Sequence, residues 1–157
     1  PVAISVGKAG CIMKAVIMGC GRVGARVASL LDHTGNEVTV IDIDSRAFQR
    51  LPATFEGDTI IGTGIDEDVL RRAGIEDADA FIAVSNGDNR NIMAAQVARL
   101  VFNVPEVVCR IYDPVREDTY RRLGLTTVCP TTTISAMILD SVMRASDDDD
   151  TPRGGTT

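Results

Sequence analysis

Short apolar runs alternate with segments of helical periodicity along most of this sequence. The first of these runs, at residues 14–18, has the composition of a strand buried on both faces, and the others are also predicted to be strands. The runs lie at residues 14–18, 38–42, 59–62, 79–84, 107–111 and 126–129. Between and after them, helical patterns occur at residues 22–31, 45–51, 66–72, 90–102, 113–124 and 133–144. Strands that alternate with helices at these spacings predict a single α/β domain, a Rossmann-like doubly wound parallel sheet of six strands.

Three glycines follow the first strand in the G-x-G-x-x-G spacing. In such a loop Gly19 would allow the tight turn out of the strand, Gly21 would let a diphosphate approach the backbone, and Gly24 would let the helix pack close to the sheet. The N–H groups and positive dipole end of the following helix favour phosphate binding. The loop, with Cys20 and Val23 at its variable positions, is therefore a candidate nucleotide-binding site.

An acidic residue ends the second predicted strand, eighteen positions after the last loop glycine. Asp42, followed by Ile43, stands where a carboxylate can bind the hydroxyls of an adenosine ribose. The same carboxylate would repel a 2′-phosphate, so NAD is favoured over NADP. NAD(H) and ATP/ADP share the adenosine half, and the residues leave both open.

Other candidate binding residues come from the ends of strands and from arginines near the loop. Arg22, in the first turn of the helix, can pair with phosphate oxygens. Arg110 lies within a predicted strand, where an unpaired charge is costly, and so calls for a phosphate or an acidic partner. Polar loop residues follow the third and fourth strands, at the edge where open α/β sheets bind ligands: Thr63, Gly64, Ser85 and Asn86.

Composition excludes several classes of function. A net charge of −6 argues against a nucleic-acid partner, and no apolar run is long enough to insert into a membrane. One histidine and four cysteines without metal-like spacing predict no metal site. We expect no catalytic residues, because the few lysines and the histidine lie away from the loop. Cys20, beside a helix N-terminus, could still be a reactive thiol.

The ends of the chain differ from its middle. Residues 1–12 resemble an extension or cloning remnant that precedes a domain spanning 13–145. Residues 146–157 contain consecutive aspartates and little apolar surface, which predicts a disordered acidic tail.

Four stretches together resemble one known family. They are Gly19-Cys20-Gly21-Arg22-Val23-Gly24, Val40-Ile41-Asp42-Ile43-Asp44, Val69-Leu70-Arg71-Arg72-Ala73-Gly74-Ile75-Glu76-Asp77-Ala78-Asp79-Ala80 and Arg110-Ile111-Tyr112-Asp113-Pro114. Over about residues 13–143 the chain is similar to the RCK, or KTN, N-terminal nucleotide-binding domain of the Trk-type potassium-uptake regulatory subunit. The glycine loop is common to many Rossmann domains, whereas the other stretches are more specific.

The resemblance implies a cytoplasmic regulator, held at the inner face of the cell membrane by a potassium transporter or channel. It would bind NAD(H) or ATP/ADP and form homodimers or larger rings, with its last helix crossing to a neighbour. By the same resemblance the loop glycines and Arg22 hold phosphates, Asp42 holds the ribose, and Thr63 and Gly64 flank the adenine.

Two departures from that family stand out. The family commonly has Gly-Asp-Ala where this chain has Gly62-Thr63-Gly64, and its C-terminal lobe has no counterpart in this sequence. The chain is thus either an excised domain or a short version. Two other functions stay open: the cofactor domain of an NAD-dependent oxidoreductase that lacks its catalytic part, and an interaction module without a working pocket.

Overall fold

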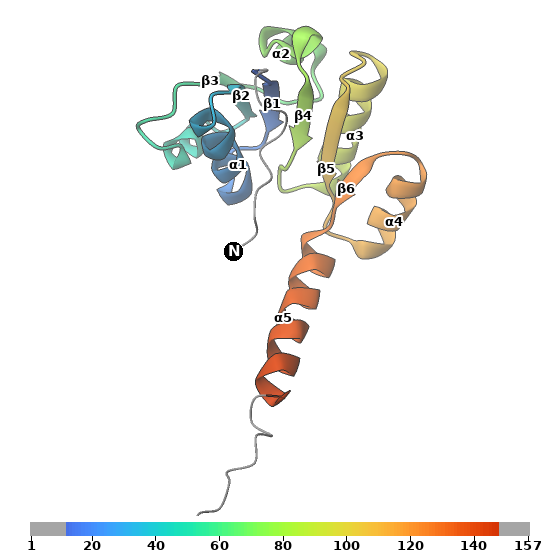
Figure 1. Ribbon diagram of the computed structural model, residues 1–157. Coiled ribbons are helices and arrows are strands. Elements are labelled where there is room, and N and C mark those ends of the chain that lie inside the picture. The colour runs from blue at the N-terminus through green and yellow to red at the C-terminus, as the bar shows by residue number, and fades with distance from the viewer. Residues whose placement is uncertain (1–11, 148–157) are drawn as a thin grey trace, which may run out of the picture.

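Six parallel strands form one sheet in the order β3-β2-β1-β4-β5-β6 in the computed structural model, which describes residues 12–147 (Figure 1). The strands are β1 (Lys14–Met18), β2 (Glu37–Asp42), β3 (Asp58–Ile61), β4 (Ala80–Ala83), β5 (Glu106–Arg110) and β6 (Thr126–Val128). The helices are α1 (Arg22–His33), η1 (Ser45–Arg50), α2 (Glu67–Arg72), η2 (Ile75–Asp77), α3 (Asp88–Leu100), α4 (Pro114–Arg122) and α5 (Pro130–Asp147). The predicted fold class is confirmed.

The strand order reverses next to β1. From β1 the chain builds outward to β2 and β3, then returns to pair β4 with the other side of β1 and continues to β5 and β6. The backbones of β1 and β4 run in register from Ala15 opposite Ala80 to Met18 opposite Ala83. In open α/β sheets, ligands bind outside the carboxyl ends of the strands at such a reversal.

Apolar side chains cover both faces of the sheet and form two cores. Neighbouring residues of a strand point to opposite faces, so Val16 enters one core and Ile17 the other. The larger core joins the sheet to α2, α3 and α4, and its largest fully buried side chains include Phe81, Leu70 and Ile75. The smaller core joins it to α1 and η1. Burial on both faces explains why the central strands are largely apolar in the sequence, whereas the edge strands β3 and β6 are mostly exposed.

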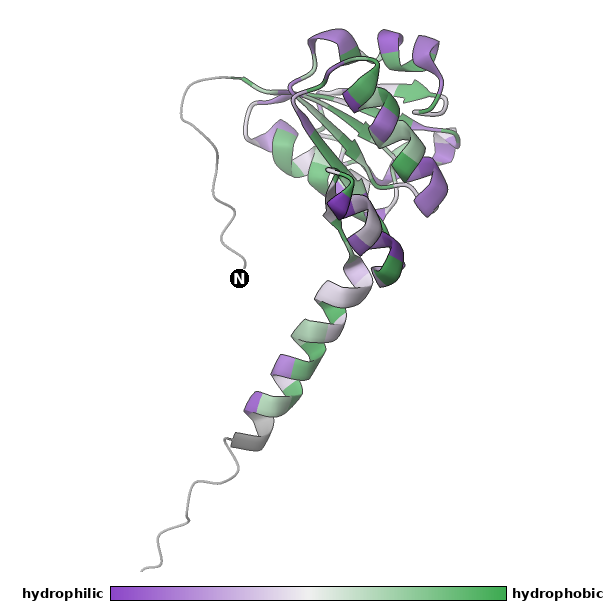
Figure 2. Ribbon diagram, turned by 90° about the vertical axis from the view of Figure 1, so that its right-hand side faces the viewer, coloured by the Kyte–Doolittle hydropathy of each residue, from purple (hydrophilic) through white to green (hydrophobic). Residues whose placement is uncertain are grey.

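The last helix extends away from the sheet (Figures 1 and 2). The sequence predicts a helix at residues 133–144, whereas α5 begins at Pro130 and ends at Asp147. Proline suits a first helical position because its missing N–H would have no partner there. The helix therefore continues two residues into the segment assigned to the acidic tail. The rest of that tail and the extension at residues 1–11 lie outside the described residues.

Apolar residues occur along α5, which extends away from the sheet (Figure 2). More than half of the surface is exposed on each of Ile134, Met137, Ile138, Leu139, Val142 and Met143. An amphipathic helix normally buries its apolar face against another element. The apolar face of α5 is exposed, so it presents a surface suited to a partner. Within residues 12–147, no helix combines the length and the hydropathy needed to cross a membrane.

Candidate functional site

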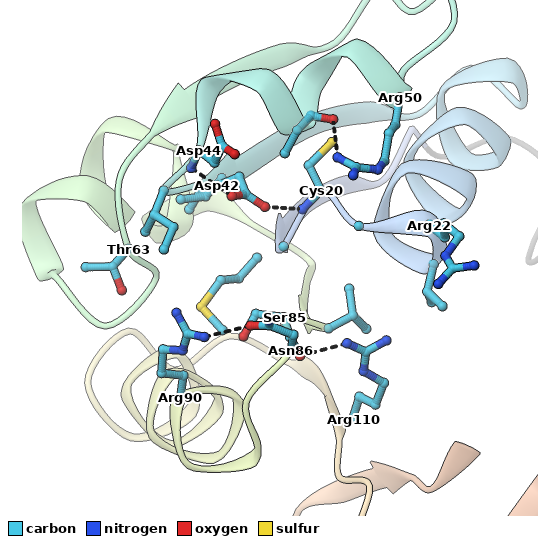
Figure 3. Close-up of a pocket in the computed structure, with 18 of the residues that line it drawn as sticks. Cys20, Arg22, Asp42, Asp44, Arg50, Thr63, Ser85, Asn86, Arg90 and Arg110 are labelled. Carbon is cyan, nitrogen blue, oxygen red and sulfur yellow. Dashed lines mark hydrogen bonds between the residues drawn. The ribbon is translucent and has the colours of Figure 1, made fainter. Parts of the chain in front are cut away.

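A cavity of about 690 Å³ opens at the carboxyl ends of the strands, where the strand order reverses (Figure 3). It brings together eleven of the thirteen binding residues proposed from the sequence. These are Gly19, Cys20, Gly21, Arg22, Val23, Asp42, Ile43, Thr63, Ser85, Asn86 and Arg110. The other two, Gly24 and Gly64, do not line it.

The glycines of the loop between β1 and α1 have different tasks. Gly19 has a φ of 105°, and a Cβ there would lie 2.7 Å from the backbone nitrogen of Ser85. A Cβ on Gly24 would lie 1.8 Å from the carbonyl oxygen of Gly19, so this residue sets how closely α1 approaches β1. A Cβ on Gly21 would meet nothing within 4 Å, and its backbone is open to the cavity.

The N-terminus of α1 faces the same cavity through Arg22 and Val23. No side chain caps this helix end. The N–H groups of its first turn are thus free to bind an anion, and the helix dipole adds to their attraction. This geometry suits a phosphate, the ligand that the glycine spacing predicts for the loop.

Asp42, at the end of β2, is tied to the loop. Its carboxylate accepts the backbone N–H of Cys20 at 2.7 Å through Oδ2 and that of Asp44 at 2.9 Å through Oδ1. A carboxylate oxygen can accept more than one hydrogen bond, so a ribose hydroxyl can still reach it. Asp42 therefore fixes the loop and offers an acceptor to the cavity.

The thiol of Cys20 is buried beneath the loop. Burial raises its pKa, the Asp42 carboxylate raises it further, and Arg50 opposes these effects in part. The neutral thiol is therefore the stable form at neutral pH. A reactive thiolate at this helix N-terminus, one of the possibilities left by the sequence, is disfavoured.

Four arginines from different elements line the cavity (Figure 3). Arg22 and Arg110 were identified from the sequence, whereas Arg50 of η1 and Arg90 of α3 were not. Arg50 donates to the carbonyl oxygen of Ala47 at 3.4 Å, and Arg90 donates to Asn86 Oδ1 at 2.7 Å. Together they favour an anionic ligand.

Arg110 lies on the wall opposite the second strand and is 9% exposed. Its Nη2 donates to the carbonyl oxygen of Ser85 at 2.7 Å, and its guanidinium carbon lies 4.6 Å from the centre of the Tyr112 ring. No carboxylate pairs with it among residues 12–147, and its buried Nε has no hydrogen-bond partner there. The structural salt bridge considered at the sequence level is absent in this part of the chain. Because the Arg110 side chain lines the cavity without an ion-pair partner in this part of the chain, an anion bound there would balance its charge.

Thr63 and Gly64, both on the loop after β3, separate in the structure. Thr63 lines the cavity. Gly64 is buried behind it, and a Cβ there would lie 2.6 Å from Sδ of Met18. Gly64 thus allows the loop to pack on β1 rather than contact a ligand.

Several lining residues were missed because packing, rather than motif spacing, brings them to the cavity. Asp44 follows β2, and Tyr112 follows β5. Pro130 and Ile134 come from the first turns of α5. Their positions just after the carboxyl ends of strands were the available signal. No group of three His, Cys, Asp or Glu able to hold a metal occurs within residues 12–147.

Comparisons with known proteins agree with this geometry. The chain is 55% identical over 116 residues to the Trk system potassium uptake protein TrkA of Streptomyces coelicolor. That match covers 74% of this chain and 52% of the relative, so the chain spans about half of that protein's length.

Solved structures show the same fold at low sequence identity. The GsuK channel bound to NAD has a TM-score of 0.72 and 24% identity, covering 90% of this chain and 25% of that one. The Shewanella denitrificans Kef CTD in AMP-bound form has a TM-score of 0.70 and 20% identity, covering 84% of this chain and 81% of that one. Residues 15–131 also match the family described as the TrkA-N domain. The resemblance drawn from the sequence is confirmed: this chain belongs to the TrkA-N domain family.

Proposed function

We propose that the chain is a nucleotide-sensing regulatory domain that acts on a potassium transporter or channel from the cytoplasmic side of the membrane. The observation that carries this proposal is the cavity: a glycine loop, an open helix N-terminus and the Asp42 carboxylate meet beside the first turns of α5. Membership of the TrkA-N family and the potassium uptake protein among its relatives support the transport partner.

The residues fit an adenine nucleotide. Gly21 leaves the loop backbone open to a phosphate, and Arg110 brings a positive charge to the cavity wall. Asp42 would accept ribose hydroxyls, and Thr63 would flank the adenine. The proposed ligands are NAD(H) and ATP/ADP. Structures that are similar to this chain include one with NAD and one with AMP, which supports the class.

Regulation rather than catalysis suits the side chains at the cavity. Among the described residues that line it, none is a histidine or a lysine. Its Asp42 carboxylate already accepts two backbone N–H groups, and its Tyr112 ring stacks on Arg110. A hydride-transfer enzyme normally needs a proton donor or acceptor beside the nicotinamide. We therefore propose that bound nucleotide is sensed and not turned over.

The path from nucleotide to partner would begin at α5. Pro130 and Ile134 line the cavity, and Thr131 Oγ1 donates to the carbonyl oxygen of Tyr112 at 2.7 Å. A ligand in the cavity would thus lie against the base of the helix. The exposed apolar side chains of α5 would pack on a second copy, giving a homodimer or a ring of dimers. Nucleotides that bind two arrangements of that dimer unequally would shift their populations.

Thermal unfolding with NAD, NADH, NADP, ATP, ADP and AMP tests the proposal. A ligand at 100 times its Kd stabilises by about 2.7 kcal/mol, which raises Tm by about 5–10 °C in a chain of this size. We expect such a shift for at least one nucleotide other than NADP, and its loss in Arg22→Ala. Arg26→Ala, one turn along α1 and outside the cavity, should keep it. No shift with any nucleotide would contradict the proposal.

A further inference from the structure

Asn91, in the first turn of α3, is completely buried but does not line the cavity. Its side-chain amide forms four hydrogen bonds, two accepted by Oδ1 and two donated by Nδ2. Oδ1 accepts from the backbone N–H of Ser85 at 2.9 Å and from Ser85 Oγ at 2.7 Å. Nδ2 donates to the carbonyl oxygens of Ser85 and Arg110, both at 2.9 Å. A buried polar group that is so fully satisfied fixes the groups around it.

These bonds join the ends of two neighbouring strands at the cavity wall. Ser85 follows β4, Arg110 ends β5, and the side chain of Asn91 bridges the two backbones. The guanidinium of Arg110 closes the network, because its Nη2 donates to the same Ser85 carbonyl that Asn91 binds. Asn91 therefore controls both the backbone from which Arg110 projects and the oxygen that orients its side chain.

A second side chain from the same helical turn holds the next residues of this wall. The carboxylate of Asp88 accepts the backbone N–H of Tyr112 at 3.0 Å and that of Asp113 at 3.3 Å. The Tyr112 ring, against which Arg110 stacks, is thus fixed from α3 as well. The first turn of α3 thus holds the backbone from Arg110 to Asp113 through hydrogen bonds from Asn91 and Asp88.

We propose that Asn91 is a positioning residue for the nucleotide site, which aims Arg110 at an anionic group of the bound ligand. The inference rests on the proposed function. Arg110 lines the cavity, its Nη2 is held by the Ser85 carbonyl, and no carboxylate pairs with it among residues 12–147, so its charge can pair with a ligand phosphate. Asn91 does not touch that phosphate. It acts through Ser85 and Arg110.

A double-mutant cycle separates this role from a merely structural one. The variants are Asn91→Leu, which is similar in volume but forms none of the four hydrogen bonds, Arg110→Gln, and the two combined. Gln96→Leu is the control, because Gln96 is exposed on the same helix. Affinity for ADP and for NAD is measured by calorimetric titration below the Tm of every variant.

We expect Asn91→Leu to weaken binding about tenfold or more, and Arg110→Gln to do the same. The double variant should bind within about twofold of Arg110→Gln, because Asn91 has nothing left to aim. Gln96→Leu should bind as the unmodified chain does. If Asn91→Leu fails to fold, Asn91→Ser, which leaves room for a bridging water, replaces it in the cycle.

Three outcomes would overturn parts of the account, and they can be told apart. If the unmodified chain binds neither nucleotide, the proposed function fails, and the positioning role fails with it. If it binds and Arg110→Gln is weakened but the Asn91 variant is not, only the positioning role fails. Losses that multiply in the double variant would show that Asn91 affects binding independently of Arg110, which also contradicts the inference.

Discussion

Removing the Asp42 carboxylate should destabilise the domain before any ligand is considered. The side chain accepts the N–H groups of Cys20 at 2.7 Å and Asp44 at 2.9 Å, and the first of these belongs to a fully buried residue. A hydrogen bond to a charged group contributes about 1.5–3 kcal/mol. Because Asp42 is only half-buried, water recovers part of the loss, and we expect Asp42→Ala to cost about 2–4 kcal/mol. Tm should fall by about 5–15 °C.

The same substitution should change the chemistry of Cys20. The Asp42 carboxylate raises the pKa of that thiol, so its removal lowers the pKa, while burial keeps it above the ordinary value. Asp42→Asn separates the two effects, because an amide oxygen keeps one acceptor but carries no charge. It should lower the pKa of the thiol as Asp42→Ala does, with about half of the loss in stability.

Thermal unfolding and the rate of thiol alkylation at the Cys20 peptide, followed against pH, measure both effects. Asp58→Ala is the matched control, because Asp58 is exposed at the opposite end of the sheet, where β3 begins. An Asp42→Ala variant with the Tm and alkylation profile of the unmodified chain would refute the reasoning. It would show that the carboxylate neither holds the loop nor acts on the thiol.

Three further perturbations test other parts of the structure. Gly24→Ala places a Cβ 1.8 Å from a backbone oxygen and should cost about 3 kcal/mol or more in unfolding free energy. Gly21→Ala should keep Tm and weaken nucleotide binding. Equal Tm losses in the two variants would contradict the different roles assigned to these glycines. Glu117→Gln tests a carboxylate whose pKa is lowered by hydrogen bonds from Thr127 and an arginine. Its stabilisation is present above the unfolded pKa of about 4.3 and is lost as pH falls through the lower folded pKa, so the Tm gap to the variant should shrink between about pH 5 and 3. Ile138→Glu should weaken self-association in sedimentation velocity without changing the nucleotide-induced Tm shift, and an unchanged association would contradict packing through α5.

The fold followed from the sequence because its signals are local. The four central strands, β2, β1, β4 and β5, are largely apolar and buried, and the glycine loop fixes where the first strand turns into its helix. Asp42 could be placed at the cavity because strand ends in a parallel sheet share one edge. The strand order and the cavity position then followed from the fold class.

The remaining site residues depend on packing between distant elements. In the sequence Asn91 is one polar residue in a helix, and only the structure shows that it joins Ser85 to Arg110. Arg90 likewise reaches the cavity because of the way α3 packs on the sheet. The glycine motif predicted that Gly24 lets α1 pack close to the sheet, and the structure places it there, whereas the resemblance did not reveal that Gly64 packs against Met18.

The apolar pattern of α5 predicted a helix but not its exposure. A stripe of apolar residues normally indicates a buried face, and within a single copy of this chain that face is uncovered. Sequence patterns report that a surface is suited to burial, and they do not report whether the cover belongs to the same chain. The family resemblance implies that α5 crosses to a neighbouring copy of the chain, and this remains a prediction.

Backbone amide hydrogen exchange of the intact chain, with and without the nucleotide that gives the largest Tm shift, tests the central claim most directly. Bound nucleotide should slow exchange at residues 20–24, where the loop N–H groups would hold the phosphates, and at residues 131–134, where α5 meets the cavity. The exposed amides where β3 begins, at the opposite end of the sheet, should exchange as before. Protection of the loop alone would remove α5 from the regulatory path. Unchanged exchange at both segments would contradict a nucleotide site in this cavity.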